Sequence, residues 1–230
     1  MVFFLLKKPN EKFKEFIFSL SAGVMLSSTI FSLIIPSLEA QDGLLGNSII
    51  STSLGMVIGV SVMFLMDQFI KYKDNDLNLK KMFTVMTIHN IPEGVVVGIA
   101  TSLILIDNLD VNAYSLFISL VIGIGIQNIP EGLVVSLPFY LGGYSKRKSF
   151  TYGFISGIVE PIFSIITIML SFLLSKILPF LLSISAGMIL YVVIVELVPK
   201  VFNKDDKNNF FGVFGFVFGF VLMLILDHII

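Results

Sequence analysis

The sequence contains no cysteine and no tryptophan, only two histidines, and few charged residues. Without cysteine there are no disulfides and no thiolate ligands. Any bound metal would therefore be held by oxygen and nitrogen atoms, which argues against a dedicated copper(I) site. Charged residues make up 13% of the chain, about half the share that is usual in soluble domains. The net charge of −1 says little about partners.

Hydrophobic residues make up 56% of the 230 residues, and the mean hydropathy is +0.96. The apolar runs are long enough, at roughly 20 residues, to cross a bilayer core of about 30 Å. They are continuous rather than alternating, which favours helices over the strands of a membrane barrel. The sequence therefore predicts an all-α, polytopic membrane helix bundle that forms a single transmembrane domain over 1–230. Seven helices are expected, at about 15–38, 48–70, 82–105, 114–140, 149–175, 178–201 and 210–230.

Lysine and arginine gather at alternate ends of these predicted helices. All of them except Lys176 fall on one side of the membrane in this arrangement. The positive-inside rule therefore predicts a protein of the cell membrane with a cytoplasmic N-terminus and an external C-terminus.

Two segments recur within the sequence. SLSAG at 19–23 returns as SISAG at 183–187, and LMDQFI at 65–70 is echoed by ILDHII at 225–230. In the predicted topology the first copy enters the membrane from the inside and the second from the outside. The copies are therefore expected to be inverted, as in secondary transporters that build a binding site between two repeats.

The repeat is incomplete at the N-terminus. Full symmetry would require a further helix before residue 15 to match the helix at 149–175. Met1–Leu6 is apolar but too short to cross a membrane, and its lysines follow it, unlike those of a signal peptide. We expect these six residues to be the cytoplasmic end of the missing helix.

Two neighbouring predicted helices carry the related segments HNIPEG and QNIPEG in opposite directions. His89 and Glu93 lie one helical turn apart, and so do Gln127 and Glu131, so each pair shares a helix face. The proline in each segment removes a backbone hydrogen bond, which is expected to kink the helix and free a carbonyl oxygen. The pattern predicts a mixed nitrogen and oxygen cage for a cation.

Glu93, Glu131 and Glu160 lie about ten residues, or roughly 15 Å, from the lysine-rich ends of their helices, near the membrane midplane. Each ionised carboxylate there costs roughly 2.5–3.5 kcal/mol. Because the lysines and arginines are placed at loops and helix ends, protons or a bound cation are expected to neutralise the cluster. Imidazole, carboxylate and amide ligands suit zinc, iron(II), manganese or cadmium better than calcium or magnesium.

Other polar and small residues have weaker functional claims. Glu196 could line an exit path or could be an interfacial carboxylate in contact with water. Asp67 and Asp227 are expected at solvated helix ends. The spacing of Gly215 and Gly219 is typical of close helix contact, and we expect packing within the protein rather than a dimer face.

The paired hexapeptides, the Gly-x-x-Glu-Pro element that ends at Pro161 and the Ser-Ala-Gly helices together resemble the ZIP (Zrt/Irt-like) family of metal transporters. The resemblance spans nearly the whole chain from about Glu15 onward. It implies eight helices in a 3+2+3 inverted arrangement, in agreement with the missing helix. Gln127 stands where many relatives have histidine, and in this the chain resembles the bacterial GufA-like branch.

The resemblance also implies the metal ligands and the partners. One metal position would use His89, Glu93, Gln127 and Glu131, and an adjacent one Asn90, Glu93, Asn128, Glu131 and Glu160. The expected partners are divalent metal ions, carried as substrate, and the lipid bilayer. No organic cofactor and no nucleic acid is expected, and a homodimer is left open.

These observations lead to a hypothesis of alternating-access transport of divalent transition metals into the cytoplasm, with zinc first and iron, manganese and cadmium as alternatives. The protein is then not an enzyme. An intramembrane zinc-dependent hydrolase could use the same ligands, but the sequence has no HExxH motif and no obvious base. A proton-coupled carrier of a non-metal solute would explain the glutamates and leave His89 and the paired asparagines without a task.

Overall fold

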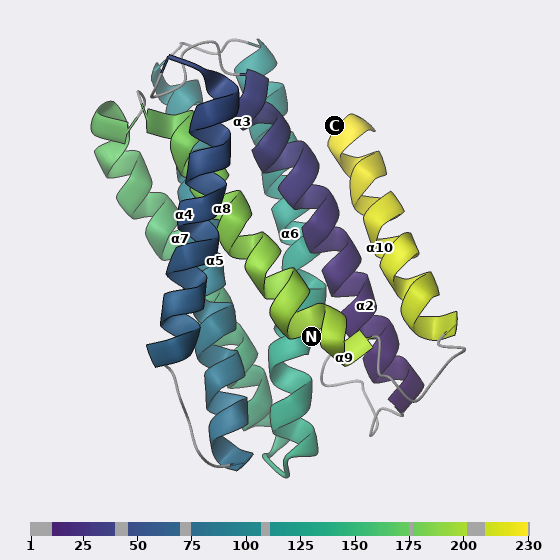
Figure 1. Ribbon diagram of the computed structural model, residues 1–230. Coiled ribbons are helices and arrows are strands. Elements are labelled where there is room, and N and C mark those ends of the chain that lie inside the picture. Colours follow the sequence, from purple (N-terminus) through teal and green to yellow (C-terminus); the bar gives the residue numbers. More distant parts are fainter. Residues whose placement is uncertain are drawn as a thin grey trace.

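The computed structural model describes residues 11–39, 46–69, 75–106, 111–174, 177–201 and 210–229. Within these ranges every regular element is helical (Figure 1). Six helices are long and apolar enough to cross a membrane, and Phe210–Leu226 is a shorter apolar helix. The predicted all-α membrane helix bundle is confirmed, and its description as one domain stays a prediction.

The first and sixth predicted spans each contain a π-helical segment. The elements are α2 (Glu11–Ser28), η1 (Thr29–Ile34), α3 (Ile35–Glu39), α4 (Ser48–Phe69), α5 (Asn75–Ile106), α6 (Val111–Leu141), α7 (Lys146–Leu174), α8 (Leu178–Val192), η3 (Val193–Leu197), α9 (Val198–Val201) and α10 (Phe210–Ile229). The helices α2 and α5 begin several residues before the predicted starts. An apolar run marks only the part of a helix that lies in lipid, and a helix can continue into water.

Some predicted features lie outside the described residues. They are the N-terminal segment Met1–Leu6, the lysines of the connections at 70–74, 175–176 and 202–209, and the side chains of His89 and Asp227. The described cations Lys80, Lys146 and Lys148 stand at helix ends on one side of the bundle, here called the lysine-rich side.

Close helix contacts repeat between the two predicted copies. Gly23 in α2 lies against the carbonyl of Phe216 in α10, and Gly187 in α8 lies against the carbonyl of Met56 in α4. These residues stand at equivalent positions of the two repeats. A side chain at either glycine would overlap the facing backbone, so glycine is required for the close approach. The pair α2–α10 is therefore packed in the same way as the pair α8–α4.

The π-helical segments repeat as well. The segments η1 and η3 each begin ten residues after the start of a Ser-x-Ser-Ala-Gly segment. Figure 1 shows that the copies run in opposite directions, since α2 leads up to α3 whereas α8 leads down to α9. These contacts and directions agree with the inverted arrangement expected from the sequence.

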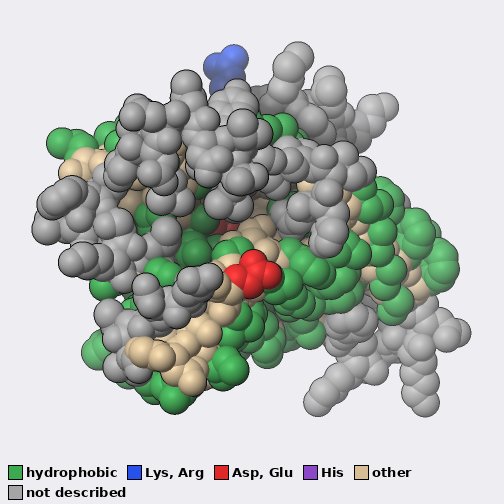
Figure 2. Space-filling view, turned by 90° about the horizontal axis from the view of Figure 1, so that it is seen from above, with side chains coloured by type: hydrophobic (Ala, Val, Ile, Leu, Met, Phe, Trp, Pro, Cys, Tyr) green, Lys and Arg blue, Asp and Glu red, His purple; other side chains and the backbone are tan. Residues whose placement is uncertain are grey.

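The remaining helices α5, α6 and α7 form a group in which each contacts the other two. The helix α6 also packs against α2, and α5 against α8, so the group joins both repeats. Large hydrophobic side chains are exposed along α4, α7 and α10. Figure 2, which looks down on the end opposite the lysine-rich side, shows hydrophobic side chains on the described flanks and few charged ones. Such a surface suits lipid as its solvent.

Candidate metal site

Six of the seven predicted ligand residues come together inside the group of α5, α6 and α7. The Glu93 carboxylate comes from α5, Glu131 from α6 and Glu160 from α7, and these side chains are 3%, 3% and 8% exposed. Asn90 is buried beside Glu93 on α5, and Gln127 is fully buried on α6. The seventh, His89, lies within α5, but its side chain is outside the described part of the structure.

Two amide side chains of α6 bind carboxylates of the other two helices. Gln127 Nε2 donates a hydrogen bond to Glu93 Oε1, and Asn128 Nδ2 donates one to Glu160 Oε2. Hydrogen bonds to an ionised group are about twice as strong as those between neutral groups. The first two residues of QNIPEG thus join α6 to both α5 and α7.

The three carboxylates interact through their charges. When ionised, Glu131 and Glu160 would each repel the negative charge of Glu93. Inside a bilayer the surrounding dielectric constant is low, so this repulsion is stronger than in water. A divalent cation placed among the three would remove it.

Buried amide oxygens are available at the same place. Asn90 Nδ2 donates a hydrogen bond of 2.8 Å to the carbonyl of Ser156 in α7, which fixes the orientation of the Asn90 amide. The Oδ1 atom of Asn90 and the Oε1 atom of Gln127 are buried and accept no hydrogen bond from the described residues. Ser156 was not singled out in the sequence, although it lies one turn before Glu160 on the same helix face.

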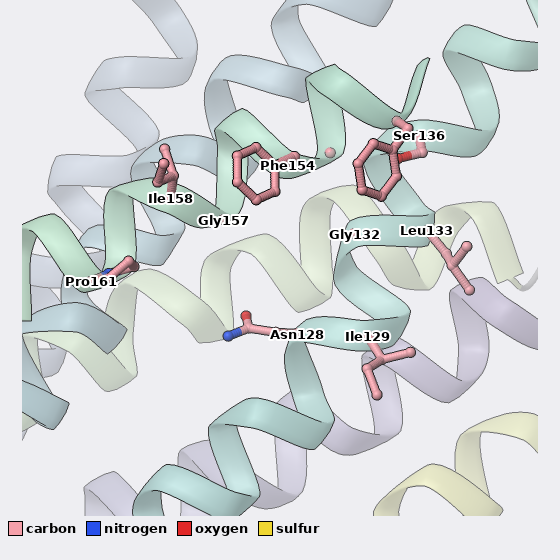
Figure 3. Close-up of a pocket in the computed structure, with 11 residues that line it drawn as sticks. Asn128, Ile129, Gly132, Leu133, Ser136, Phe154, Gly157, Ile158 and Pro161 are labelled. Atoms are coloured by element: carbon pink, nitrogen blue, oxygen red, sulfur yellow. The ribbon is translucent and has the colours of Figure 1, made fainter. Parts of the chain in front are cut away.

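A small cavity of about 30 Å³ lies between these groups, with Asn90, Asn128, Glu131 and Ser156 in its wall. This volume is enough for one water molecule, and therefore for a bare ion of similar size. The cavity shares Asn128 and three glycines with a much larger groove between α6 and α7. Figure 3 shows Asn128 directed from α6 into the space that separates the two helices.

A close backbone contact positions Glu160. Gly94, the last residue of HNIPEG, lies against the carbonyl of Glu160, and a Cβ atom there would overlap it. The equivalent Gly132 of QNIPEG has open space. Among the described residues, a Cβ atom at Gly132 would have no neighbour within 4 Å beyond the adjoining backbone of its own helix. The first glycine is thus needed for helix contact and the second is not.

The described groups are arranged as carboxylate–amide pairs. No three of the described histidine, aspartate and glutamate side chains are grouped so that they could hold one metal ion. A cation that enters would therefore have to displace the amide N–H groups of Gln127 and Asn128 from the carboxylates. The same amides could then turn their oxygen atoms toward the ion.

The other candidate residues have mixed outcomes. Asp67 is half-buried and accepts a hydrogen bond of 3.3 Å from the Tyr191 hydroxyl, because α4 packs against α8. It is therefore not simply a solvated helix end. Glu196 is half-buried in η3. Gly215 and Gly219 pack against the backbone of α2, as expected from their spacing.

A comparison with known protein families gives a match to the ZIP zinc transporter family over residues 82–227. The chain belongs to the ZIP zinc transporter family. The matched region includes α6, α7 and α8 and all seven predicted ligand residues. With its apolar helices, the chain is a multi-pass membrane protein.

Individual members of the ZIP family are also similar to this chain. It is 27% identical over 251 positions to the zinc transporter ZupT of Oceanobacillus iheyensis, covering 98% of this chain and 90% of that protein. It is 38% identical over 149 positions to human zinc transporter ZIP11, covering 64% of this chain and 42% of that protein. The zinc transporter GufA of Myxococcus xanthus is 31% identical over 142 positions, covering 62% of this chain and 52% of that protein. The chain thus spans most of ZupT and about half of ZIP11 and GufA. The resemblance to the family and its GufA-like members is confirmed.

Proposed function

We propose that this chain transports divalent transition metal ions, zinc first and also iron, manganese or cadmium, into the cytoplasm by alternating access. The ions would be substrates that pass through the site rather than resident cofactors. The proposed ligands are His89, Asn90, Glu93, Gln127, Asn128, Glu131 and Glu160.

One observation carries the proposal. Three carboxylates from three different helices are buried within the α5–α7 group, two of them hydrogen-bonded to amides of α6, and the buried amide oxygens of Asn90 and Gln127 lie beside them. A hydrolase would need a base and a bound water aimed at a substrate, and no described feature favours that alternative. The names of the relatives, all zinc transporters, support zinc as the first metal to test.

The site chemistry suits passage rather than storage. An arriving ion would exchange its water for carboxylate and amide oxygens while the N–H groups of Gln127 and Asn128 move away from the glutamates. When the ion leaves, those hydrogen bonds can form again. Because each step replaces one set of charge-assisted contacts with another, binding would be reversible, as transport requires.

The proposed direction of metal transport follows from the distribution of the lysine residues. The lysine-rich side would face the cytoplasm by the positive-inside rule. The group α5–α7 would shift against the paired helices α2–α10 and α8–α4 to expose the site alternately to each side. Protons compete with metals for carboxylates, so uptake should fall as the pH on the entry side is lowered.

The test is metal-resolved uptake into liposomes that contain the purified chain. We expect uptake of zinc and of at least one of manganese, iron and cadmium, and loss of that uptake in Glu93→Gln. Glu39→Gln makes the same change at the exposed end of α3 and should leave uptake intact. Equal uptake in Glu93→Gln and the unmodified chain, or turnover of lipid or peptide by zinc-loaded protein without any uptake, would reject the proposal.

A further inference from the structure

A groove of about 640 Å³ runs along the contact between α6 and α7 in their lysine-rich halves. Its volume lies within the range of about 300–1,000 Å³ that is usual for small-molecule sites. On α7 its lining begins at Phe150 and ends at Pro161, an interval that spans roughly 16 Å of helix. The hydrocarbon of one bilayer leaflet is about 15 Å deep. The groove therefore has the length of an acyl chain that crosses one leaflet.

Small residues form the floor of the groove. The two helices touch there, because Gly153 of α7 lies against the Gly132 carbonyl and the Ser136 side chain of α6. Beside this contact there is room. Among the described residues, a Cβ atom at Gly132 or Gly157 would meet nothing within 4 Å beyond the adjoining backbone of its own helix. The lack of a side chain at these two positions gives the groove its depth, and both glycines also line the small cavity of the candidate metal site.

The walls of the groove are apolar and open to the outside of the bundle. Phe154 and Ile158 of α7 and Ile129 of α6 line the groove, and all three side chains are exposed. Figure 3 shows how the lining residues of the two helices are placed around this space. Because both helices are apolar enough to cross a membrane, the open side faces lipid. A molecule that fills the groove has to be apolar along this length.

Two cations stand at the lysine-rich end of the groove. Lys146 and Arg147 begin α7, and they precede Phe150 by one helical turn. Residues at this spacing share a helix face, so both cations belong to the face of α7 that lines the groove. The Nζ atom of Lys146 lies 5.8 Å from the centre of the Tyr140 ring, and Arg147 is exposed. Basic and tyrosine residues are typical of the boundary between hydrocarbon and headgroups.

Acidic residues do not offset these cations along the two helices. Between residues 111 and 174 the only acidic residues are Glu131 and Glu160, and both are buried in the candidate metal site. Basic pockets between membrane helices on the cytoplasmic side are typical sites for anionic lipid headgroups. The apolar length and the basic end together favour an amphiphile with a negatively charged head.

We propose that a phospholipid with an anionic headgroup binds in this groove, with one acyl chain along Gly132 and Gly157 and its phosphate beside Lys146 and Arg147. The cytoplasmic leaflet, which the lysine-rich side would face, holds the anionic lipids of the membrane. Each cation should favour an anionic lipid roughly fivefold. A lipid such as phosphatidylcholine fits the groove but gains less from the cations, because its choline group offsets the phosphate charge.

Fluorescence quenching tests the proposal, because the chain has no tryptophan of its own. Phe154→Trp is reconstituted into phosphatidylcholine vesicles that contain phosphatidylglycerol as the minor lipid. The acyl chains of one lipid or the other carry bromine, which quenches tryptophan at short range. We expect brominated phosphatidylglycerol to quench several-fold more per mole than brominated phosphatidylcholine.

Phe218→Trp on α10 is the matched control. Phe218 lies eight residues after the start of its helix, as Phe154 does, and the two side chains are 47% and 57% exposed. The control should show a several-fold smaller preference for phosphatidylglycerol. An equal preference at both positions, or equal quenching per mole by the two lipids at Phe154→Trp, would overturn the proposal in favour of ordinary bulk lipid.

Two further variants separate the headgroup from the acyl chain, each measured with the Phe154→Trp reporter. Lys146→Gln with Arg147→Gln removes the charge and should lower the preference to the level of the control. Gly157→Leu keeps both cations and fills the groove, and it should lower the preference as well.

A preference that survives the loss of both cations, or one that survives Gly157→Leu, would overturn the proposed position of the lipid. Weak quenching by both lipids would overturn it in favour of protein in the groove. If Gly157→Leu does not fold, the variant that lacks the cations still decides. The readout does not depend on transport, so it stands apart from the proposed function.

Discussion

The helices α5 and α6 carry almost the same hexapeptide, yet the two segments make different contacts with the neighbouring helices. In α5 the segment is covered by α7, and its glycine touches the backbone that carries Glu160. In α6 the glycine is open, and the first two side chains reach out to Glu93 and Glu160 instead. The α5 segment thus joins α7 by the Gly94 backbone contact and the Asn90 hydrogen bond to Ser156, whereas the α6 segment joins both neighbours through side-chain hydrogen bonds to their carboxylates. A repeated motif can therefore have two structural roles within one site.

The largest effect on zinc uptake should come from removing the glutamate that both hexapeptides contain. Glu93→Gln and Glu131→Gln each remove one carboxylate from the site while keeping its shape. We expect each to lower zinc uptake by at least about 10–100-fold, the loss typical of removing even an outer partner of a metal ligand. Uptake into liposomes measures this. If only one substitution had an effect, the two helices would not contribute equally to binding.

Substitution of the glycine should have different effects on stability in the two helices. Gly94→Ala places a methyl group against the Glu160 carbonyl, so we expect a loss of stability of about 1–3 kcal/mol, as for overpacking in protein cores, together with reduced uptake. Gly132→Ala enters open space and should be close to the unmodified chain. Thermal unfolding in detergent compares the two. Similar midpoints would show that the difference between the helices is not one of packing.

The first residue of the hexapeptide should affect selectivity more than activity. Gln127→His makes the α6 segment identical to that of α5 and offers a second imidazole. Because imidazole suits zinc better than manganese, we expect the ratio of zinc to manganese uptake to rise several-fold. Gln127→Asn, which shortens the side chain and adds no imidazole, is the control. An unchanged ratio in Gln127→His would mean that this position does not contact the ion.

The smallest difference between the two helices is expected when their asparagines, Asn90 and Asn128, are replaced by alanine. Asn90→Ala removes a hydrogen bond to the Ser156 carbonyl and should cost about 0.5–1.5 kcal/mol of stability. Asn128→Ala removes the partner of Glu160 and should mainly alter metal affinity. Calorimetric zinc binding beside thermal unfolding distinguishes them. Because Asn90 is also a proposed ligand, we expect both variants to bind zinc less tightly, and unchanged affinity in Asn90→Ala would remove Asn90 from the proposed ligands.

Much of the fold was predictable because few backbone structures can satisfy all their hydrogen bonds inside a lipid bilayer. A chain with 56% hydrophobic residues in continuous runs must satisfy its backbone hydrogen bonds within each span, so the helices and their approximate ends follow. The repeated Ser-Ala-Gly segments also predicted the inverted copies. In the structure, Gly23 and Gly187 lie against equivalent carbonyls, which agrees with that prediction. The half-buried Asp67 was not predicted, since its partner Tyr191 lies on a helix distant in sequence.

By itself the sequence determined the helices, their repetition, the kinds of atom offered by the proposed ligands and the positions of Glu93, Glu131 and Glu160 along their spans. Helical period and membrane thickness are local rules, and they act on each segment separately. Only the tertiary structure decided which amide binds which carboxylate, that Ser156 orients Asn90, and that Gly94 is covered while Gly132 is open. Those facts depend on the rotation and separation of α5, α6 and α7, which packing sets and which no single helix encodes.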